Sequence, residues 1–518
     1  MNLDFTGISS HYPGQAEPVL SELTLRIGRG FTGVAGANGS GKTTLLLLAC
    51  GLLKPTGGHV RIPGSVAYCP QRTDQCPEDL LRLLETPDSL AAQLVSRLGL
   101  GPSWTQRWDT LSHGERKRAQ IGCALWHQAD VLAIDEPTNH VDAATRQFLI
   151  TALRQYRGIG LLVSHDRQLL DELCTNCLIF EHGTPVLRGG GYSEAHAAAE
   201  REMESLQRQK QNATQTLRSL AAMAAERRRE ADRSVARLSK RHVAKGDSDG
   251  RGKINLARST GKGGTARRQV RQLQGRLDQA TERAEALFVP KSARLTLELC
   301  GEVSRRRVLL QLNPGMIDLC PTRHLRFPRL QIGCEDRIGI IGPNGCGKSS
   351  LVHHLLAVLG SRDTQVLYLP QEIGVEQSRA ILAGVKHLDS RQLGAVMSGI
   401  ATLGSEPSRV LATETPSPGE LRKLLLALGL SERPNLIIMD EPTNHLDLPS
   451  IQCLENALAE CHCSLVLVSH DALLVQRLTR TVWSIAEMNG EAVLTVCERV
   501  PGCTRDMETG SSDHGLGS

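Results

Sequence analysis

Two glycine-rich loops in the sequence have the residues and the spacing of a phosphate-binding loop. They run from Gly36 to Thr43 and from Gly342 to Ser349, and both fit the pattern G-x-x-x-x-G-K-[ST]. An apolar segment precedes each loop and a helical pattern follows it, which is the context that such a site requires. The glycines let backbone N–H groups surround phosphate oxygens, and the start of the helix adds partial positive charge. We therefore expect nucleotide phosphates at both loops.

A lysine and a hydroxyl side chain close each loop. Lys42 and Lys348 would reach the β- and γ-phosphates of a nucleotide. The hydroxyl groups of Thr43 and Ser349 would bind the Mg²⁺ ion that accompanies the phosphates. ATP and Mg²⁺ are therefore the expected ligands.

Two adjacent carboxylates follow a short apolar run in each half of the chain. Asp135 and Asp440 come directly after the run, so each would emerge from a buried strand, where a carboxylate can bind Mg²⁺. Glu136 and Glu441 come next and can polarise an attacking water as general bases. The pairs predict two hydrolytic centres.

A glutamine and a histidine also recur in both halves. Gln71 and Gln371 are placed to sense the metal ion and the water, and His165 and His470 are placed to contact the γ-phosphate. A single histidine or glutamine is most often a structural residue. Here each recurs in register with the other motifs, which favours a functional interpretation.

The whole chain is an internal repeat, because the motifs recur in one order at nearly one offset. Lys42, Gln71, Asp135 and His165 are followed after 306, 300, 305 and 305 residues by Lys348, Gln371, Asp440 and His470. Each copy alternates strand-like and helical segments with its motifs at strand ends, which is typical of a parallel α/β sheet. We predict α/β domains at residues 1–191 and 291–500, a linker at 192–290 and a disordered tail at 501–518.

A serine and a glycine that open a helix occur once in each copy. Ser112 with Gly114 and Ser417 with Gly419 begin 23 residues before the Asp of their own copy. A hydroxyl and N–H donors at a helix start form a further phosphate site. The glycine-rich loop of the same copy already holds the phosphates, so this second site would serve the nucleotide of the partner domain.

The segment between the copies is basic and helical in pattern. Residues 192–290 hold 21 Lys or Arg and 12 Asp or Glu, whereas the net charge of the whole chain is +5. Apolar residues recur at 3-and-4 spacing over two stretches, which predicts two helices joined as an antiparallel hairpin. The apolar positions are Met203, Leu206, Ala213, Leu217, Leu220, Ala224, Ala231, Val235 and Leu238, then Val270, Leu273, Leu277, Ala280, Ala284 and Leu287.

Together these motifs resemble those of the ATP-binding cassette superfamily. The run Glu-Pro-Thr-Asn-His-Leu/Val-Asp, at 136–142 and 441–447, is typical of its family F, as are tandem cassettes and a basic helical linker. The resemblance implies two tandem P-loop ABC ATPase domains joined by a long α-helical hairpin. It also implies a cytoplasmic ATPase that acts on the ribosome at the exit-tRNA site, with its linker reaching toward peptidyl-tRNA. Such proteins are translation factors or protect the ribosome from antibiotics.

The resemblance also implies two composite ATP sites in a monomer whose cassettes pair head to tail. The catalytic residues would be Glu136, Glu441, His165 and His470, and the metal ligands Thr43, Gln71, Asp135, Ser349, Gln371 and Asp440. The first ATP site would contain Gly36, Asn38, Gly39, Ser40, Gly41, Lys42, Thr43, Thr44, Gln71 and Asp135 with Ser417 and Gly419. The second would contain Gly342, Asn344, Gly345, Gly347, Lys348, Ser349, Ser350, Gln371 and Asp440 with Ser112 and Gly114.

Several residues depart from the family pattern, and we expect them to make the two sites differ. The Leu-Ser-Gly-Gly-Glu signature of the family has His113 in the first copy, and Pro416 and Pro418 in the second. Proline has no N–H to donate to a phosphate. Tyr12 is placed to stack on adenine in the first site, whereas the equivalent stretch near Asp318 has no aromatic residue.

Basic residues cluster near the expected tip of the hairpin. They are Lys240, Arg241, Lys245, Arg251, Lys253, Arg258, Lys262, Arg267 and Arg268. Only Tyr192 and Phe288 are aromatic between residues 192 and 290, which disfavours base stacking. With the cassettes on either side, we expect phosphate contacts to ribosomal RNA and to P-site tRNA, with steep salt dependence.

Composition argues against other classes of protein. Fifteen scattered cysteines indicate reduced thiols rather than a disulfide scaffold, and the Cys174–Cys177 pair is best interpreted as packing. The run Leu45–Leu53 is too short to cross a membrane, and Met1–Tyr12 does not resemble a signal peptide, so we expect neither membrane insertion nor secretion.

The alternatives are a transport ATPase that docks on a separate membrane protein, a non-hydrolytic clamp and a DNA-repair ATPase. The basic linker disfavours the first of these, the two glutamates the second, and the lack of zinc modules the third.

Overall fold

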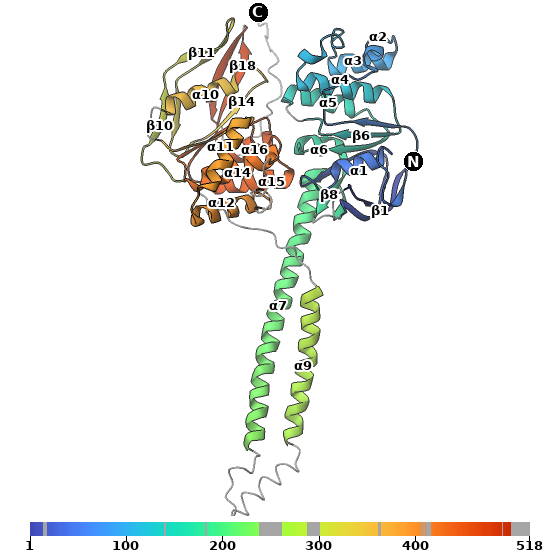
Figure 1. Cartoon of the computed structure of the whole chain (residues 1–518), viewed down its shortest axis with the longest axis vertical. Helices are drawn as coiled ribbons and strands as arrows, with labels where there is room; N and C mark the ends of the chain where they lie inside the picture. Colours follow the sequence, from blue (N-terminus) through green and yellow to red (C-terminus); the bar gives the residue numbers. More distant parts are fainter. Residues whose placement is uncertain are drawn as a thin grey trace, which may run out of the picture. The chain divides into compact units, whose positions relative to one another are not determined.

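The chain forms two units in a computed structural model (Figure 1). The structure describes residues 1–13, 18–138, 141–181, 184–237, 262–286, 301–360, 364–405, 407, 410, 416–488 and 490–498. One unit comprises Met1–Ala195 with Ala293–Ser518, and the other comprises His196–Ser292. We call residues 1–195 the first cassette and residues 301–498 the second cassette.

The first cassette is built around a six-stranded sheet in the order β5-β6-β7-β3-β8-β9. All neighbouring strands in it are parallel except β8 and β9, which form an antiparallel pair. A second, antiparallel sheet has the order β2-β1-β4. The elements are β1 (Leu3–Ser10), β2 (Leu20–Ile27), β3 (Gly30–Gly36), α1 (Lys42–Ala49), β4 (Gly57–Arg61), β5 (Val66–Cys69), α2 (Leu80–Glu85), α3 (Ser89–Leu98), a 3-10 turn (Trp108–Thr110), α4 (His113–Trp126), β6 (Val131–Asp135), α5 (Ala143–Leu153), β7 (Ile159–Val163), α6 (Arg167–Leu173), β8 (Cys174–Glu181) and β9 (Thr184–Gly189).

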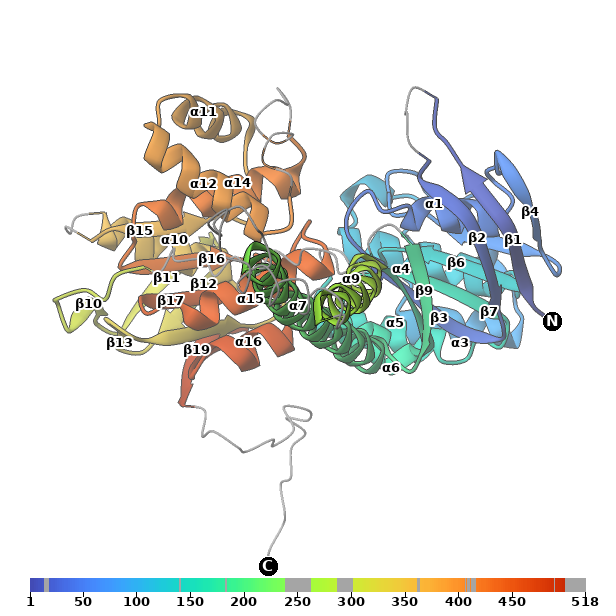
Figure 2. The same ribbon diagram turned by 90° about the horizontal axis from the view of Figure 1, so that it is seen from below.

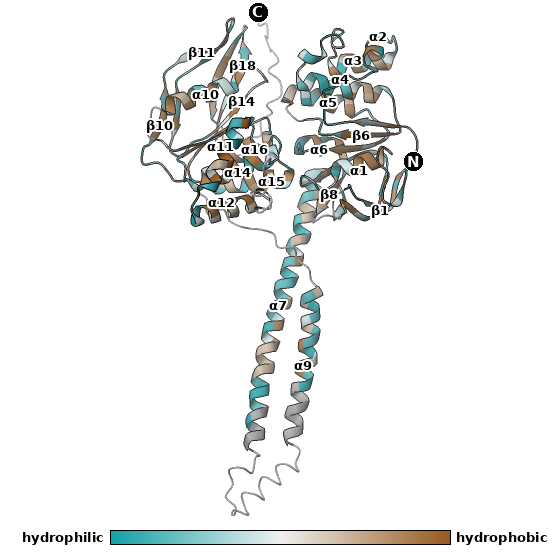
Figure 3. Ribbon diagram, viewed as in Figure 1, coloured by the Kyte–Doolittle hydropathy of each residue, from teal (hydrophilic) through white to brown (hydrophobic). Residues whose placement is uncertain are grey.

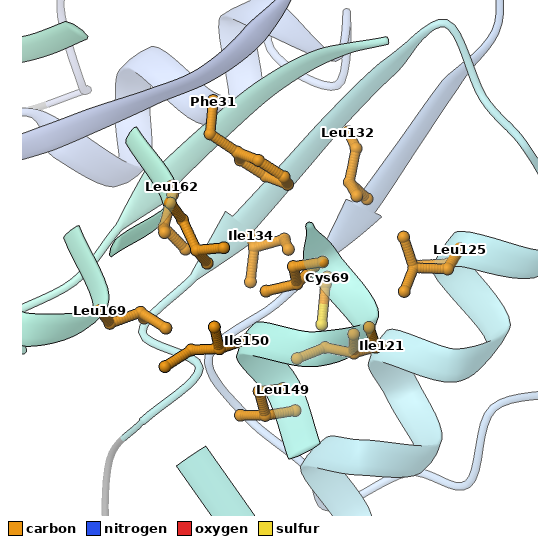
Figure 4. Packing of buried hydrophobic residues seen from close by; sticks show 14 of the residues in the cluster. Phe31, Cys69, Ile121, Leu125, Leu132, Ile134, Leu149, Ile150, Leu162 and Leu169 are labelled. Atoms are coloured by element: carbon orange, nitrogen blue, oxygen red, sulfur yellow. The ribbon is translucent and has the colours of Figure 1, made fainter. Parts of the chain in front are cut away.

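The central strands of this sheet are buried on both faces, which is why β6 and β7 are apolar throughout. Leu132 and Ile134 of β6 belong to a hydrophobic cluster with α4, α5 and α6, whereas Val131 and Ala133 belong to a cluster with α1. Because side chains alternate along a strand, the two clusters lie on opposite faces of the sheet. Figure 4 shows part of the first cluster, where strand and helix side chains meet. Each fully buried Leu or Ile contributes about 1.5–3 kcal/mol to folding.

The second cassette repeats this plan in an eight-stranded sheet of order β11-β12-β19-β18-β14-β17-β16-β15, with a separate β10-β13 pair. Its strands β15, β16, β17, β14 and β18 are parallel, and β18–β19 and β11–β12 are antiparallel. The elements are β10 (Val308–Leu312), β11 (Gly315–Cys320), β12 (Arg323–Phe327), β13 (Leu330–Gly333), β14 (Arg337–Ile341), α10 (Lys348–Leu359), β15 (Val366–Leu369), α11 (Val375–Lys386), α12 (Ser390–Thr402), α14 (Pro418–Ser431), β16 (Leu436–Asp440), α15 (Leu448–Glu460), β17 (Ser464–Val468), α16 (Ala472–Leu478), β18 (Thr481–Met488) and β19 (Glu491–Glu498).

The predicted parallel α/β sheets are therefore confirmed for the strands that carry the motifs. The antiparallel strands at the sheet edges and the β2-β1-β4 sheet were not predicted. Strand pairing in a hairpin depends on the turn and on cross-strand side chains rather than on any motif. Cys174 and Cys177 lie in β8 and are buried in the hydrophobic core, in keeping with a packing role.

The linker unit consists of two helices, α7 (Tyr192–Arg237) and α9 (Lys262–Ala286), which lie side by side (Figures 1 and 2). A groove between them is lined from both helices, among others by Met223 and Leu273. The seam residues whose side chains the structure describes are partly buried, and Leu220 is buried. The predicted helical hairpin is confirmed. Figure 3 shows that both helices carry mostly hydrophilic or neutral residues, as a solvated hairpin requires.

Candidate ATP sites

The first phosphate loop joins β3 to α1, the strand–loop–helix context that its sequence predicted. Lys42 Nζ donates to the carbonyl oxygens of Gly36 and Ala37, both at 2.9 Å, so the ammonium group lies over the loop. Gly41 precedes α1 with φ at +99°, and a Cβ there would stand 2.9 Å from Val19 Cγ1. Only glycine fits this backbone without strain. The second loop has the same arrangement at Gly347 and at its lysine.

The two carboxylates of the first site emerge where β6 ends. Asp135 Oδ2 accepts a hydrogen bond from Thr43 Oγ1 at 2.8 Å, which ties the strand end to the phosphate loop. Glu136 follows in a left-handed conformation with φ at 46°, and its N–H donates to Val163 O. Glu441 has the same conformation, with φ at 48°. Left-handed backbone at a bulky residue is strained and typical of functional sites.

Each predicted base contacts the predicted histidine of its own cassette. The backbone N–H of His165 donates to Glu136 Oε2 at 3.3 Å, and the ring Nε2 lies 3.1 Å from Oε1. The backbone N–H of His470 donates to Glu441 Oε2 at 3.3 Å. The His470 ring lies farther from its glutamate, with Nε2 at 3.5 Å from Oε1, and at 2.9 Å from Asn344 Oδ1. The histidine is thus oriented differently in the two sites.

Burial is the main cause of the pKa shifts of these two glutamates and two histidines. It raises the pKa of Glu136 and of Glu441 to about 7, and the lysine of each loop partly opposes the shift. It lowers the pKa of His165 and of His470 to about 4, so both imidazoles are neutral near pH 7. A carboxylate with a pKa near the working pH is suited to general base catalysis.

These pKa values predict that the rate of ATP hydrolysis falls on the acidic side of its pH profile. A general base acts only when ionised, so kcat/KM for ATP should fall about tenfold per pH unit below about pH 7. The two histidines titrate too low to produce this fall. The measurement is ATP turnover at subsaturating ATP from about pH 5 to about pH 9. A flat profile down to about pH 5 would contradict the assignment of the bases.

The first site opens into a cavity of about 450 Å³ that takes residues from both cassettes. Such a volume suits a ligand of the size of a nucleotide. From the first cassette the lining includes Tyr12, Asn38, Gly39, Gly41, Lys42, Thr43, Thr44, Gln71, Asp135, Glu136 and His165, and from the second cassette Ser417, Pro418, Gly419 and His445. Gly36 and Ser40 belong to the loop but are not among the lining residues. The structure thus places Ser417 and Gly419 at the lysine of the other cassette.

The second site opens into a cavity of about 470 Å³. Its lining includes Asn344, Gly345, Gly347, Lys348, Ser349, Ser350, Gln371, Asp440, Glu441 and His470, and from the first cassette Thr138, Val141, Arg146 and Asp166. Gly342, Ser112 and Gly114, all within the described residues, are not among those that line it. Leu319 lines the second cavity beside Gly347, as Val19 lines the first beside Gly41, and in the first site Tyr12 OH also lies 3.1 Å from Thr44 Oγ1.

Both signature helices begin with the same cap despite their altered sequences. Ser112 Oγ and Ser417 Oγ each accept a hydrogen bond from the N–H of the glutamate three residues later, at 3.3 Å. Both glutamates return the contact to the serine N–H, which completes a capping box. Pro418 occupies the first helical position, where a missing N–H costs nothing in the helix. The proline therefore leaves the cap intact and removes only a donor to the ligand.

The glycines of the two signatures differ in the space around them, which predicts unequal effects of alanine. A Cβ on Gly419 would stand 2.7 Å from His445 O, so backbone must move, whereas a Cβ on Gly114 would meet Thr145 Cγ2 at an ordinary 3.4 Å. Gly419→Ala should therefore slow turnover at the first site by about tenfold, for a cost of about 1–3 kcal/mol.

The measurement is ATP turnover in variants with one working site, which separates the two glycines. Gly419→Ala is combined with Glu441→Gln, and Gly114→Ala with Glu136→Gln as the matched control. In the control we expect little change in rate and up to about 1 kcal/mol of added stability from the better helix former. Equal losses from the two alanines would contradict the packing argument.

An aspartate in each cassette reaches the phosphate loop of the other, a contact that the sequence analysis did not predict. Asp447 Oδ2 accepts from the N–H of Asn38 at 2.7 Å, and Asp142 Oδ2 accepts from the N–H of Asn344 at 3.5 Å. Each Asp ends the Glu-Pro-Thr-Asn-His-x-Asp run, so its recurrence in both copies was an available signal. The shorter contact lies at the first site.

The oxygen donors at each strand end fit Mg²⁺. Asp135 and Thr43 supply hard oxygens in contact with each other, and Asp440 and Ser349 line the second cavity together. Within the described residues there is no cluster of three or more His, Cys, Asp or Glu that would hold a metal by itself. This composition matches Mg²⁺, which is usually held by one or two protein oxygens together with substrate phosphates.

Most of the predicted RNA-binding residues lie outside the part of the chain that the structure describes. Lys240, Arg241, Lys245, Arg251, Lys253 and Arg258 lie outside the described residues. Lys262, Arg267 and Arg268 belong to the first turns of α9. The tail at 501–518 also lies outside the described residues.

The sequence matches known proteins over most of its length. Residues 20–139 and 325–444 match the family described as ABC transporter. The ribosome protection protein VmlR of Bacillus subtilis is 29% identical, over 87% of this chain and 80% of that protein. The tylosin resistance ATP-binding protein TlrC of Streptomyces fradiae is 29% identical, over 92% and 96%. The ATP-binding protein Uup of Caulobacter vibrioides is 30% identical, over 88% and 73%.

Solved structures share the fold at lower identity. The archaeal ribosome recycling factor aABCE1, solved with the ribosomal stalk protein aP1, has a TM-score of 0.61 and 18% identity, over 94% of this chain and 89% of that chain. The RNase-L inhibitor has a TM-score of 0.60 and 17% identity, over 94% and 90%. Identity this low shows the fold alone. No helix within the described residues has the length and apolar character that a membrane crossing needs.

Proposed function

The chain belongs to family F of the ATP-binding cassette proteins and is an ATP hydrolase with two cassettes, and from this premise we propose that it acts on the ribosome. The relatives named for ribosome protection and for tylosin resistance support the proposal, because the matches cover 80% and 96% of those proteins. Their names favour protection of the ribosome from an antibiotic over a housekeeping role in translation.

We propose that the two cassettes close on two ATP molecules, each with Mg²⁺. The observation that carries this step is the first cavity, where Ser417 and Gly419 of the second cassette stand with Lys42 and Glu136 of the first. The sites that we propose for ATP, Mg²⁺ and catalysis are those named from the sequence. The bound Mg²⁺ would neutralise phosphate charge, while Glu136 and Glu441 would take the proton of the attacking water.

The linker is proposed to contact RNA through its basic residues. Arg227, Arg271 and Arg276 lie on α7 and α9, as do Lys262, Arg267 and Arg268 of the nine residues named from the sequence, and the other six lie outside the described residues. With few aromatic residues to stack on bases, contacts of this kind would be made to phosphates of ribosomal RNA and P-site tRNA. We propose a monomer in the cytoplasm that binds at the exit-tRNA site.

Co-sedimentation with ribosomes tests this function. The Glu136→Gln, Glu441→Gln double variant should keep ATP bound and should sediment with 70S ribosomes only when ATP is present. Its affinity should fall steeply with salt, with a slope of about −0.7 to −0.9 per phosphate contact. Replacing Lys240, Arg241 and Lys245 by Gln should flatten the slope by about 2 to 3. The matched control replaces the exposed Arg305, Arg306 and Arg307 of the second cassette by Gln.

Two outcomes would redirect the proposal. If the double variant stays at the top of the gradient at every salt concentration, the ribosome is the wrong partner, and the alternative of docking on a separate membrane protein gains support. The other outcome is that the double variant binds ribosomes while expression of the wild-type chain does not reduce the inhibition of a sensitive host by tylosin or by erythromycin. That result would favour a role as a translation factor over protection from these drugs.

A further inference from the structure

A buried cation lies at the same position on each signature helix. Lys117 of α4 stands five residues after Ser112, and Arg422 of α14 stands five residues after Ser417. Their exposed fractions are 0% and 2%. Neither forms an ion pair within the described part of the chain, although a buried charge is costly unless its surroundings compensate it.

Backbone carbonyls of the catalytic core compensate Lys117. Its Nζ donates to Pro70 O at 2.5 Å and to Asp135 O at 3.1 Å. Pro70 directly precedes Gln71, and Asp135 ends the strand β6. Gln120, one turn further along α4, also donates to this loop, at Arg72 O. The helix therefore holds the glutamine loop and the strand end together through one ammonium group.

Arg422 makes the equivalent connection in the second cassette with more hydrogen bonds. Its Nη1 donates to Glu441 O at 2.8 Å and to Asn444 O at 3.0 Å. Its Nη2 donates to Pro370 O at 3.1 Å and to Gln371 O. The planar guanidinium thus binds the glutamine loop, the residue that carries the base, and the segment leading to Asp447. A lysine cannot span these groups at once.

We propose that Lys117 and Arg422 are positioning residues for ATP hydrolysis, which hold the glutamine loop against the end of the catalytic strand in their own cassette. Arg422 also belongs to the helix whose cap, at Ser417, lines the first cavity together with Lys42, so it connects the first ATP site to the base of the second. Occupation of one site moves the signature helix, and the cation carries this movement to the glutamine loop and to the base of its own cassette. The inference rests on the proposed composite ATP sites.

The acceptors explain why these residues act on the rate rather than on ATP affinity. They are carbonyls of Asp135, Glu441 and the glutamine loops, which position the base and the water, whereas the phosphates are held by the glycine-rich loops. Loss of an interaction that matters only in the transition state lowers kcat and kcat/KM equally. The split between kcat and KM is therefore the diagnostic readout.

The test uses variants with one working site. Lys117→Met in the Glu441→Gln background should lower kcat about tenfold or more and change KM for ATP by less than about twofold. Lys117→Arg should restore most of the rate. The control is Arg118→Met, because the neighbouring guanidinium donates to Leu98 O and stacks on Trp104, away from the catalytic carbonyls. The reciprocal variant, Arg422→Met in the Glu136→Gln background, should behave in the same way.

Hydrogen exchange gives a readout that does not depend on activity. In the full-length protein without ATP, Lys117→Met should speed exchange in the peptide around Gln71, and Arg118→Met should not. Wild-type exchange in that loop, or equal losses of kcat from Lys117→Met and Arg118→Met, would overturn the inference. If the Glu441→Gln parent itself lacked turnover, the two sites would be too tightly coupled for single-site kinetics, and hydrogen exchange would decide the role of Lys117.

Discussion

The Glu136→Gln, Glu441→Gln double variant is expected to bind ATP but to hydrolyse it about 10²- to 10⁴-fold more slowly than the wild type, which is the usual contribution of a general base. Both carboxylates follow the end of a buried strand, with an N–H fixed by the neighbouring strand and a histidine in contact. The amide keeps the shape of the side chain but has no basic oxygen. The measurement is phosphate release at saturating ATP, together with binding of a fluorescent ATP analogue.

A surface glutamate provides the control for this experiment. Glu302→Gln removes an exposed carboxylate that pairs with the exposed Arg433, and its rate should equal that of the wild type. The single variants should each abolish turnover at one site, and the sum of their rates should approach the wild-type rate if the sites work independently. Turnover by the double variant at the wild-type rate would show that the base lies elsewhere.

The parts of the site that could be predicted are those encoded locally. The loop from Gly36 to Thr43 needs its glycines because the chain turns into α1 with φ at +99° at Gly41, which is a property of a few adjacent residues. The linker helices were predicted for the same reason, since burial along the seam follows a period of 3.6 residues. The partly buried Leu273 and Leu277 sit at predicted positions between exposed neighbours.

The two buried cations could not be predicted because their local sequence is ambiguous. Lys117 stands between Arg116 and Arg118, and three consecutive basic residues on a helix usually indicate a solvated face. The fold brings Pro70 O and Asp135 O to this position from segments 47 and 18 residues away. Every residue has a backbone carbonyl whatever its type, so no pattern of residue types predicts such a contact.

Contacts that occur once were missed for a different reason. Recurrence in both copies was the strongest signal of function. It cannot identify a functional residue that occurs in one copy but not in the other. Arg167 follows the Ser-His-Asp run of the first cassette, whereas Ala472 occupies that place in the second. The structure shows that this asymmetric residue carries a buried ion pair between the cassettes.

The ion pair joins Arg167 of the first cassette to Glu455 of the second, and its loss is the second large effect that we expect. The guanidinium contacts both oxygens of Glu455 and, at 3.0 Å, Asp471 Oδ2. The exposed fractions of the Arg167 and Glu455 side chains are 11% and 1%, and Arg477 completes the cluster at 2.9 Å. Arg167→Leu should cost about 2–4 kcal/mol, because it leaves a buried carboxylate with a single, half-exposed partner.

A double-mutant cycle separates this pair from general destabilisation. Replacing both residues, Arg167→Leu with Glu455→Met, should recover part of the loss, since apolar side chains can replace a buried ion pair at little cost. The expected coupling free energy is about 2 kcal/mol, measured from urea unfolding of the full chain. The control cycle, Arg154→Leu with Glu172→Met, removes a pair within the first cassette whose side chains are 56% and 27% exposed, and it should give less than about 1 kcal/mol. Equal coupling in both cycles would mean that Arg167 does not hold the cassettes together.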